Sequence, residues 1–214
     1  MKKNKSQPQL LVAGVDEVGR GPWAGPLVAC AYIEIKLTRN VKITDSKKLS
    51  KLQRENAFIK LMKNGIVGIG RVEPQEIDKL GLIKANNLAF QRAIANLKIK
   101  PDFIMIDGKD RIFPETTQNI PFKSIVHGDS LVRAISCASI IAKVTRDRLM
   151  EDFAYKYPGY SFEKNMGYGT KSHIQALAKY GPSRIHRMSY KPVKALMGKF
   201  EKSLHHKDNS SNPQ

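Results

Sequence analysis

An apolar run of strand length that ends in two adjacent carboxylates constrains this chain more than any other feature. Residues 10–15, Leu-Leu-Val-Ala-Gly-Val, lead directly into Asp16 and Glu17, and a Gly-Arg-Gly turn follows at residues 19–21. Acidic side chains beside a buried strand are costly unless they are paired or bind a metal ion. The pattern therefore favours a cation site at the end of a strand, next to a turn where glycine lets the backbone approach a ligand closely.

Apolar segments of strand length alternate with segments of helical periodicity along the rest of the chain. The pattern predicts strands at 10–16, 27–35, 65–72, 103–106 and 122–126, and helices at 50–63, 74–80, 82–97, 131–157, 170–179 and from about 192. The first two strands should form a hairpin with an elaborated turn, because two Gly-Pro pairs separate them. A mixed sheet flanked by helices, an α/β fold with a helical C-terminal extension, is therefore expected.

The two ends of the chain differ from the middle. Residues 1–9 are basic and polar, residues 201–214 are polar, and neither stretch has a periodic apolar pattern. We expect a flexible N-terminus, a disordered tail and one domain over residues 10–200 between them.

A strong positive charge limits the class of partner. Lys and Arg number 37 against 19 Asp and Glu, which gives a net charge of +18. Such an excess predicts a polyanionic partner, with nucleic acid ahead of an anionic membrane surface. No apolar run approaches the roughly 20 residues of a membrane span, and the apolar patch after the basic start is too short for a signal peptide. A cytoplasmic monomer is expected, with Cys30 and Cys137 as buried, reduced thiols.

Four acids fall at strand ends or at the start of a helix: Asp16, Glu17, Asp107 and Asp129. Taken alone, Asp107 is better explained as a turn residue and Asp129 as an N-cap. Taken together, four carboxylates without histidine suit Mg²⁺ or Mn²⁺, and two such ions about 4 Å apart can bind both reacting oxygens in phosphoryl transfer. Neighbouring strand residues point to opposite faces, so Asp16 and Glu17 can share a site only if the strand ends or bulges there. Otherwise Glu17 would act through its carbonyl or lie behind the ligands.

An ordered set of motifs resembles the bacterial ribonuclease HII family. The resemblance implies a ribonuclease H-like fold, cleavage of the RNA strand of RNA–DNA hybrids, and incision at ribonucleotides embedded in duplex DNA with 3′-hydroxyl and 5′-phosphate ends. The matching segments are residues 14–22 (Gly-Val-Asp-Glu-Val-Gly-Arg-Gly-Pro), 45–50 (Asp-Ser-Lys-Lys-Leu-Ser), 106–108 (Ile-Asp-Gly), 127–130 (His-Gly-Asp-Ser), 138–147 (Ala-Ser-Ile-Ile-Ala-Lys-Val-Thr-Arg-Asp), 167–170 (Gly-Tyr-Gly-Thr) and 186–189 (His-Arg-Met-Ser).

The resemblance also assigns roles to individual residues. It implies that the four acids are catalytic and bind two divalent ions, Mn²⁺ or Mg²⁺. It implies that Gly19, Arg20 and Gly21 sense the ribose 2′-hydroxyl, the group that distinguishes RNA from DNA, and that Tyr168 lies near the RNA–DNA junction. Trp23 and Lys109 depart from the family's usual pattern, and Trp23 is expected to affect the packing beneath the sensing loop.

Several basic residues near these motifs are candidates for phosphate contacts. Lys171, Arg184 and Arg187 flank Tyr168 and Ser189 in the sequence, whereas for Lys47 and Lys48 a phosphate contact and a plain solvated surface are equally good explanations.

Asp147 is excluded from the metal site if one unbroken helix follows Asp129. It lies 18 residues further along the chain, which is about 27 Å along a helix at 1.5 Å per residue. Asp147 is instead expected to pair with Arg146 or Arg148, and the same reasoning keeps Lys143 away from the ions.

Two other functions remain open from the sequence. A different two-metal enzyme acting on DNA, such as a nuclease or resolvase, could use a similar scaffold, but the Gly-Arg-Gly turn and Tyr168 favour the ribonuclease. The charge alone would suit a non-catalytic nucleic-acid-binding protein. Four intact acids argue against that, because acids without metal would repel the ligand.

Overall fold

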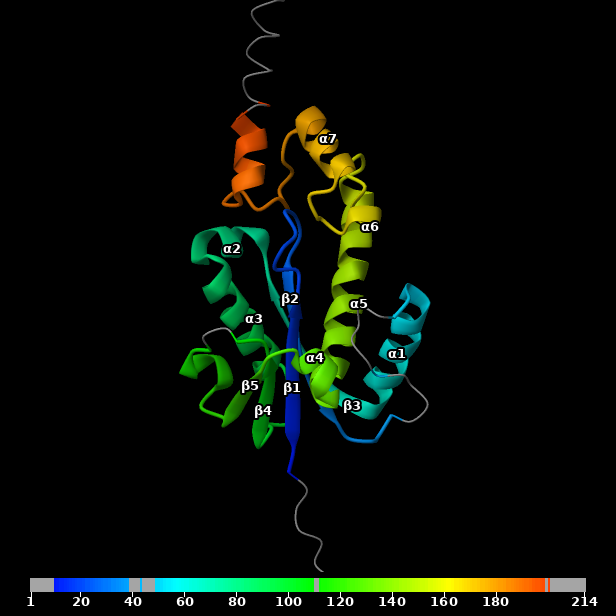
Figure 1. Ribbon diagram of the computed structural model, residues 1–214, viewed down its shortest axis with the longest axis vertical. Coiled ribbons are helices and arrows are strands. Elements are labelled where there is room, and N and C mark those ends of the chain that lie inside the picture. The colour runs from blue at the N-terminus through cyan, green and yellow to red at the C-terminus, as the bar shows by residue number, and fades with distance from the viewer. Residues whose placement is uncertain (1–9, 39–42, 44–48, 110–111, 199, 201–214) are drawn as a thin grey trace, which may run out of the picture. The chain divides into compact units, whose positions relative to one another are not determined.

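The computed structural model describes residues 10–38, 43, 49–109, 112–198 and 200 (Figure 1). The chain divides into two compact units. The first unit comprises residues 1–18, 28–71 and 87–144, and the second comprises residues 19–27, 72–86 and 145–214. The expectation of a single domain over residues 10–200 stays a prediction. Lys47 and Lys48 lie outside the described residues.

A five-stranded mixed sheet organises the first unit. Its strands are β1 (Val12–Val18), β2 (Leu27–Glu34), β3 (Gly65–Val72), β4 (Phe103–Asp107) and β5 (Phe122–Ile125), in the order β3-β2-β1-β4-β5. β1 and β2 form the expected antiparallel hairpin, with Ala13 opposite Ile33 and Val18 opposite Val28. β1 runs parallel to β4, and β4 runs parallel to β5. The predicted α/β architecture is confirmed.

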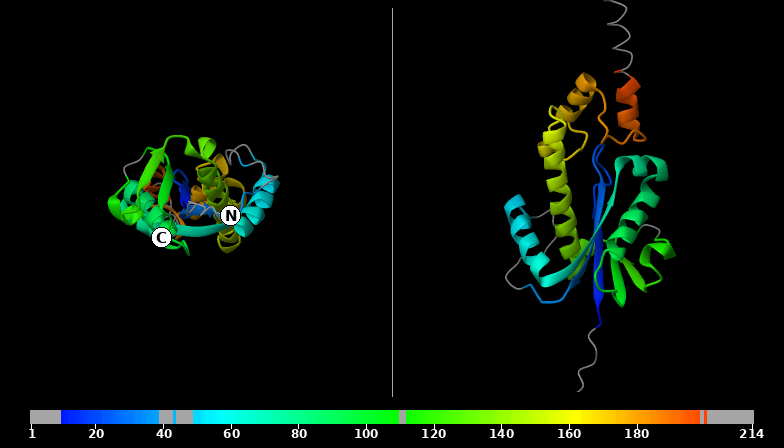
Figure 2. Two further views of the ribbon diagram at one scale, coloured as in Figure 1. Left: turned by 90° about the horizontal axis from the view of Figure 1, so that it is seen from below. Right: turned by 180° about the vertical axis from the view of Figure 1, so that it is seen from behind.

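Helices cover both faces of this sheet: α3 (Leu82–Ala95) lies on one face, and α1 (Lys51–Asn64) and the first half of α5 (Arg133–Lys156) lie on the other (Figures 1 and 2). The other helical segments described are α2 (Pro74–Leu80), α4 (Gly128–Leu131), α6 (Phe162–Asn165), α7 (Lys171–Tyr180), a 3₁₀ turn η2 (Pro114–Thr117) and residues 191–198. The alternation of side chains along β3 explains the layers. Val67 and Ile69 pack on the cluster that includes α1 and the first half of α5, whereas Gly68 and Gly70 meet the backbone of α3.

Glycine in β1 allows α5 to lie directly on the strand. A Cβ at Gly14 would lie 2.1 Å from the carbonyl carbon of Ala134, so a larger residue would push the helix away. Cys30 and Cys137 meet in the cluster beneath this contact, and both are buried free thiols, as predicted. The close approach fixes the start of α5 against the strand that carries Asp16.

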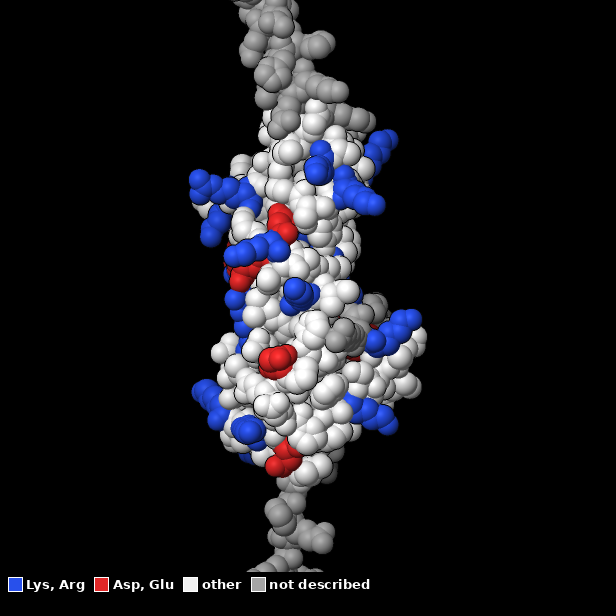
Figure 3. All heavy atoms as spheres, turned by 90° about the vertical axis from the view of Figure 1, so that its left-hand side faces the viewer, with Lys and Arg blue, Asp and Glu red and all other residues white. Residues whose placement is uncertain are grey.

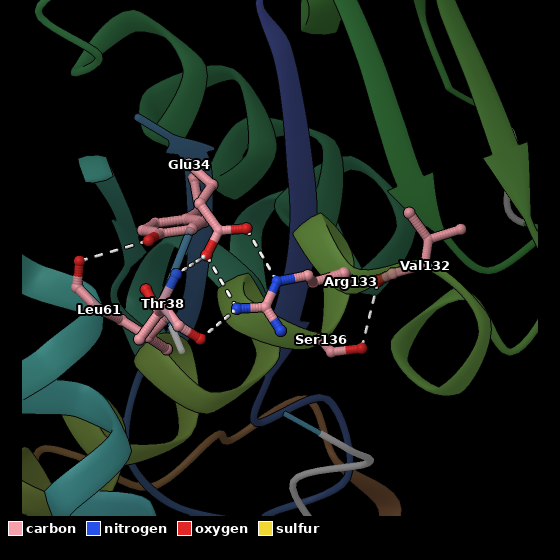
Figure 4. A network of polar contacts seen from close by, with 7 residues as sticks. Glu34, Thr38, Leu61, Val132, Arg133 and Ser136 are labelled. Atoms are coloured by element: carbon pink, nitrogen blue, oxygen red, sulfur yellow. Dashed lines mark hydrogen bonds and ion pairs between the residues drawn. The ribbon is translucent and has the colours of Figure 1, made fainter. Parts of the chain in front are cut away.

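A polar network also fixes the start of α5 (Figure 4). Arg133 donates two hydrogen bonds of 2.8 and 2.9 Å to the carboxylate of Glu34 at the end of β2, and a third to the carbonyl of Thr38. Burial alone would raise the pKa of Glu34, but the bonds from Arg133 and the Thr38 N–H outweigh it and lower that pKa. The network therefore holds the start of α5 against the end of β2.

The helix predicted over residues 131–157 is present as α5, but its start differs from the prediction. A separate short helix, α4, precedes it, and the two are divided at Val132, whose backbone is extended at φ −121° and ψ 115°. His127, in the left-handed region at φ 56°, occupies the N-cap position of α4, so neither Asp129 nor Ser130 is the cap. The short helix α4 carries Asp129 in its first turn.

The second unit has an apolar core of its own. Ala24, Met150, Phe162 and Leu177 are buried there, with Trp23 packed against them. No helix among the residues that the structure describes is long and apolar enough to span a bilayer.

Candidate active site

Two of the predicted acids lie just beyond the last paired residues of two adjacent parallel strands in the first unit. Val15 of β1 pairs with Ile106 of β4, so Asp16 and Asp107 are the next residues on two neighbouring strands. Asp16 is buried, whereas Asp107 is half-buried. The carboxyl ends of parallel strands are where sites form in open α/β sheets.

Asp129 joins this pair through hydrogen bonds to Asp107. The Oδ1 atom of Asp107 accepts from the backbone N–H of Gly128 at 2.7 Å and from that of Asp129 at 3.4 Å. Asp107 therefore binds the first turn of α4 and holds Asp129 beside the end of β4. The space at Gly128 is tight, because a Cβ would lie 2.6 Å from Ile135 Cδ1 and 3.2 Å from that carboxylate oxygen. The first N–H groups of helix α4 are thus capped by a side chain from strand β4.

The surroundings of Asp16 oppose its negative charge. Burial, the charge of Glu17 and, to a smaller extent, that of Asp107 raise the pKa of Asp16 well above its usual value. A hydrogen bond with Ser139 and the N–H of Glu17, 2.7 Å from Asp16 Oδ1, act in the opposite direction. A carboxylate in this position calls for a nearby positive charge.

Glu17 does not meet the condition set for sharing a site with Asp16. The sequence predicts that the strand ends at Asp16, but β1 continues to Val18 and pairs regularly with β2, with Glu17 opposite Ala29. Because this pairing has no bulge, alternation directs the two side chains to opposite faces. Glu17 acts on Asp16 through its charge.

The donor set suits hard divalent cations, since it consists of carboxylate oxygens. The structure brings Asp16, Asp107 and Asp129 into neighbouring positions. Among the residues described, however, no three His, Cys, Asp or Glu side chains are already placed to hold one ion together. The four-acid metal site stays a prediction.

The Gly-Arg-Gly loop belongs to the second unit, where two buried arginines hold it. Gly19 has φ 99°, and a Cβ there would lie 2.4 Å from Arg146 Nε. Arg146 donates to the carbonyls of Pro26, Ala24 and Met166, each at 3.0 Å. Glycine is therefore required at position 19 by both its backbone conformation and the adjacent guanidinium.

Arg187 completes the support of this loop. Its guanidinium donates to the carbonyls of Gly19 at 2.6 Å, Arg20 at 3.1 Å and Gly25 at 2.8 Å, and to the hydroxyl of Tyr190 at 2.8 Å. The side chain is fully buried. The prediction of Arg187 as a phosphate contact is therefore wrong, because its donors are bonded to the loop and are shielded from solvent.

The sequence does not show that Arg146 and Arg187 are buried rather than on the surface. Burial, followed by the charge of Arg187, lowers the pKa of Arg146 to about 10. The charge of Asp147 favours the ionised Arg146, and the pairing of these two residues stays a prediction.

Tyr168 lies in the second unit beside the loop. Its side chain is 46% exposed, and a Cβ at Gly21 would lie 3.5 Å from its ring. Trp23 connects the two segments, because its N–H donates to the carbonyl of Gly167 at 2.8 Å and its ring covers Gly169. Trp23 therefore packs against the turn that carries Tyr168, and its expected effect beneath the loop at residues 19–21 stays a prediction.

The other predicted phosphate contacts are open to solvent. Lys171, the first residue of α7, and Arg184 are exposed. Basic side chains are spread over the face drawn in Figure 3, with few acidic side chains among them.

Comparison with known proteins identifies similar sequences and folds. The Ribonuclease HII family profile matches residues 13–193. Ribonuclease HII of Bacillus licheniformis is 48% identical over 185 residues, which cover 86% of this chain and 71% of that protein.

Two solved structures share this fold. The ribonuclease H2 of Pyrococcus horikoshii OT3 aligns with a TM-score of 0.75 and 31% identity, over 90% of this chain and all of that one. The ribonuclease HII in a PCNA complex from Archaeoglobus fulgidus aligns with a TM-score of 0.74 and 26% identity, over 85% of this chain and 96% of that one.

Proposed function

Because the chain belongs to the ribonuclease HII family and is a nuclease, we propose that it cleaves the RNA strand of RNA–DNA hybrids and incises duplex DNA at embedded ribonucleotides. The products would carry 3′-hydroxyl and 5′-phosphate ends. The observation that carries the proposal is the placement of Asp16 and Asp107 just beyond the last parallel pair of β1 and β4, with Asp129 bonded to Asp107.

The acids would hold divalent ions, Mg²⁺ or Mn²⁺. Asp16, Asp107 and Asp129 would bind through their carboxylates, and Glu17 would contribute through its carbonyl or from behind the ligands. When bound, such ions supply positive charge where negative charge develops on the phosphate. The raised pKa of Asp16 supports this assignment, because a cation would relieve the repulsion from Glu17 and Asp107.

Selectivity for RNA would come from the loop at residues 19–21 together with Tyr168. The buried arginines beneath this loop fix its backbone before a substrate arrives. A fixed backbone can direct hydrogen bonds to a 2′-hydroxyl, which is absent from DNA. Lys171 and Arg184 are exposed and could bind phosphates, as could Lys47.

An incision assay tests the proposal directly. The substrates are a DNA duplex with one ribonucleotide, a continuous RNA–DNA hybrid and a plain DNA duplex of the same sequence, each with Mg²⁺, Mn²⁺ or EDTA. We expect cleavage of the first two only, and only with a divalent ion. Equal cleavage of plain DNA would instead support a DNA nuclease, and full activity in EDTA would exclude the metal assignment.

A further inference from the structure

Two buried histidines in the second unit meet through their ring nitrogens. His173 lies in α7, and His186 lies in the segment before Arg187. Both are almost completely buried, and their Nε2 atoms are 2.9 Å apart. Neither has a part in the chemistry proposed above.

The outer nitrogen of each ring has a partner that can play only one role. The backbone N–H of Ser183 lies 2.8 Å from His186 Nδ1, so this nitrogen must accept. The Ser183 carbonyl is further away, at 3.3 Å, and cannot bond to a nitrogen that already accepts. His173 Nδ1 lies 2.9 Å from the carbonyl of Tyr168, so this nitrogen must donate.

The bonds to Ser183 and Tyr168 determine the proton positions in the whole series of hydrogen bonds that joins these two residues through the rings. His173 carries its proton on Nδ1, and His186 carries its proton on Nε2, which it donates to Nε2 of His173. A second proton on His173 would place two N–H groups against each other. A second proton on His186 would face the N–H of Ser183. The connection from Ser183 to Tyr168 is therefore complete only when both rings are neutral.

The surroundings of the pair favour the neutral rings. Trp23, Tyr160 and Phe162 lie around them, with ring centroids 5.1 to 6.4 Å from the histidine rings. Tyr160, the titratable group among these, donates its hydroxyl to the carbonyl of Gly181. Burial and the neighbouring His173 lower the pKa of His186 to about 3, and burial lowers that of His173.

The pair joins the Tyr168 turn to the segment that supports the Gly-Arg-Gly loop. His186 forms a bridge with Ala24, and the next residue, Arg187, donates its backbone N–H to Trp23. At the other end, His173 reaches the carbonyl of Tyr168, which also accepts from the N–H of Thr170 at 2.8 Å. The orientation of the Tyr168 peptide thus depends on the histidine pair, which is attached to the segment that supports the loop.

We propose that His173 and His186 are positioning residues, a proton-ordered pair that fixes Tyr168 relative to the loop at residues 19–21 for recognition of a ribonucleotide junction. This inference rests on the proposed function in one respect, the assignment of Tyr168 to the substrate. The histidines act through Tyr168 and touch no substrate themselves.

Nitrogen-15 NMR of the intact protein tests the proton order. The imidazole signals should show His173 protonated on Nδ1, the less common tautomer of free histidine, and His186 protonated on Nε2. Neither should titrate between about pH 8 and pH 5, although free histidine does. Protonation of His173 on Nε2, or titration of either ring near the ordinary value, would overturn the inference.

A matched pair of substitutions tests the role in recognition. The amide nitrogen of His173→Asn can take the place of Nδ1 and keep the bond to Tyr168, whereas His173→Gln reaches the place of Nε2 and loses that bond. Both variants lose the ring, so thermal unfolding should rank them alike. We expect His173→Gln to have about tenfold lower kcat/KM than His173→Asn on the single-ribonucleotide duplex, the effect of one ordinary hydrogen bond.

Combination with Tyr168→Ala identifies the route of the effect. The difference between the two His173 variants should disappear in the Tyr168→Ala background, because the bond from residue 173 would have no tyrosine side chain left to position. An equal kcat/KM for both variants, or a difference that persists without Tyr168, would overturn the positioning role. Failure of the unaltered protein to incise at ribonucleotides would overturn the proposed function instead, whatever the tautomers are.

Discussion

At Asp16, the proposed metal-binding function and the stability of the folded protein oppose each other. Its carboxylate is buried beside two other acids, and both facts raise its pKa. The folded protein therefore binds a proton at Asp16 more readily than the unfolded chain does, and it loses stability as the pH rises above the unfolded value, about 3.9. Such a penalty is typical of functional carboxylates.

Replacement of Asp16 by Asn should separate these two effects. We expect cleavage to fall by at least about 10²-fold, as for loss of a preorganised electrostatic group, with binding of the hybrid largely intact. In EDTA, the variant should unfold at a higher temperature than the wild type at pH 7, and the difference should shrink toward pH 4. Asp152→Asn, at an exposed position of α5, is the control and should change little. A lower unfolding temperature at pH 7 would contradict the argument.

Arg187 shows how a buried cation can serve a loop. Replacement by Lys keeps the charge but cannot reproduce bonds to three carbonyls and a hydroxyl. We expect a loss of about 1–3 kcal/mol in unfolding free energy, the cost of leaving buried acceptors unpaired, and a smaller ratio of ribonucleotide to plain DNA cleavage. Urea unfolding and paired incision assays measure both. The exposed Arg184→Lys is the control, and equal effects of the two changes would refute the role of Arg187.

Sequence reasoning identified residues whose position in a local pattern was informative. Asp16 and Asp107 follow apolar runs, so the position of Asp107 at the end of β4 could be predicted, whereas β1 continues past Asp16 to Val18. Arg187 was misassigned because its burial depends on carbonyls more than 160 residues away in the chain. His173 and His186 were missed for a similar reason, since each has an ordinary local context and only folding brings their rings together.

At the level of elements, the apolar runs located all five strands and most of the helices. The break at Val132 could not be predicted in this way, because α4 is held by the carboxylate of Asp107 on another strand. Local periodicity continues through the break, so it predicted one helix. The difference matters for the proposed metal site, since the separate turn of α4 places Asp129 beside Asp107.

The contact of β1 with α5 gives a prediction at the same scale. Gly14→Ala should move the start of α5 away from the sheet, because the new Cβ would overlap backbone atoms of Ala134 and Ile135. We expect a loss of about 1–3 kcal/mol, as for overpacking a core, measured by urea unfolding. Gly198→Ala is the control, because no atom lies within 4 Å of its Cβ position in a helical segment. Similar losses for both variants would argue against the packing explanation.

For the whole molecule, the fold does not account for the net charge of +18. The proposed functional residues are divided between the two units. The acids of the proposed metal site lie in the first unit, whereas the loop and Tyr168 lie in the second, and the chain passes between them at Val18 and Gly19. A general positive charge would hold a polyanion on either unit without specifying its sequence.

The charge predicts a steep dependence of binding on salt. Affinity of the Asp16→Asn variant for the single-ribonucleotide duplex, measured by fluorescence anisotropy, should fall at least about tenfold between roughly 50 and 200 mM salt, because phosphate contacts release counterions. Lys171→Glu should reduce the slope by about one. Lys179→Glu, near the other end of α7, is the matched control. A salt-independent affinity would contradict phosphate binding.

The loop carbonyls that accept hydrogen bonds from Arg187 also determine which way the loop's amides face. In a trans peptide, the C=O and the following N–H point in opposite directions. The carbonyls of Gly19 and Arg20 are turned inward to the guanidinium, so the N–H groups of Arg20 and Gly21 are directed to the other side. The peptide planes of the turn are thus polarised before any ligand binds, with the electropositive edge on the face opposite Arg187. A buried cation thereby gives the turn a surface suited to oxygen atoms rather than to cations.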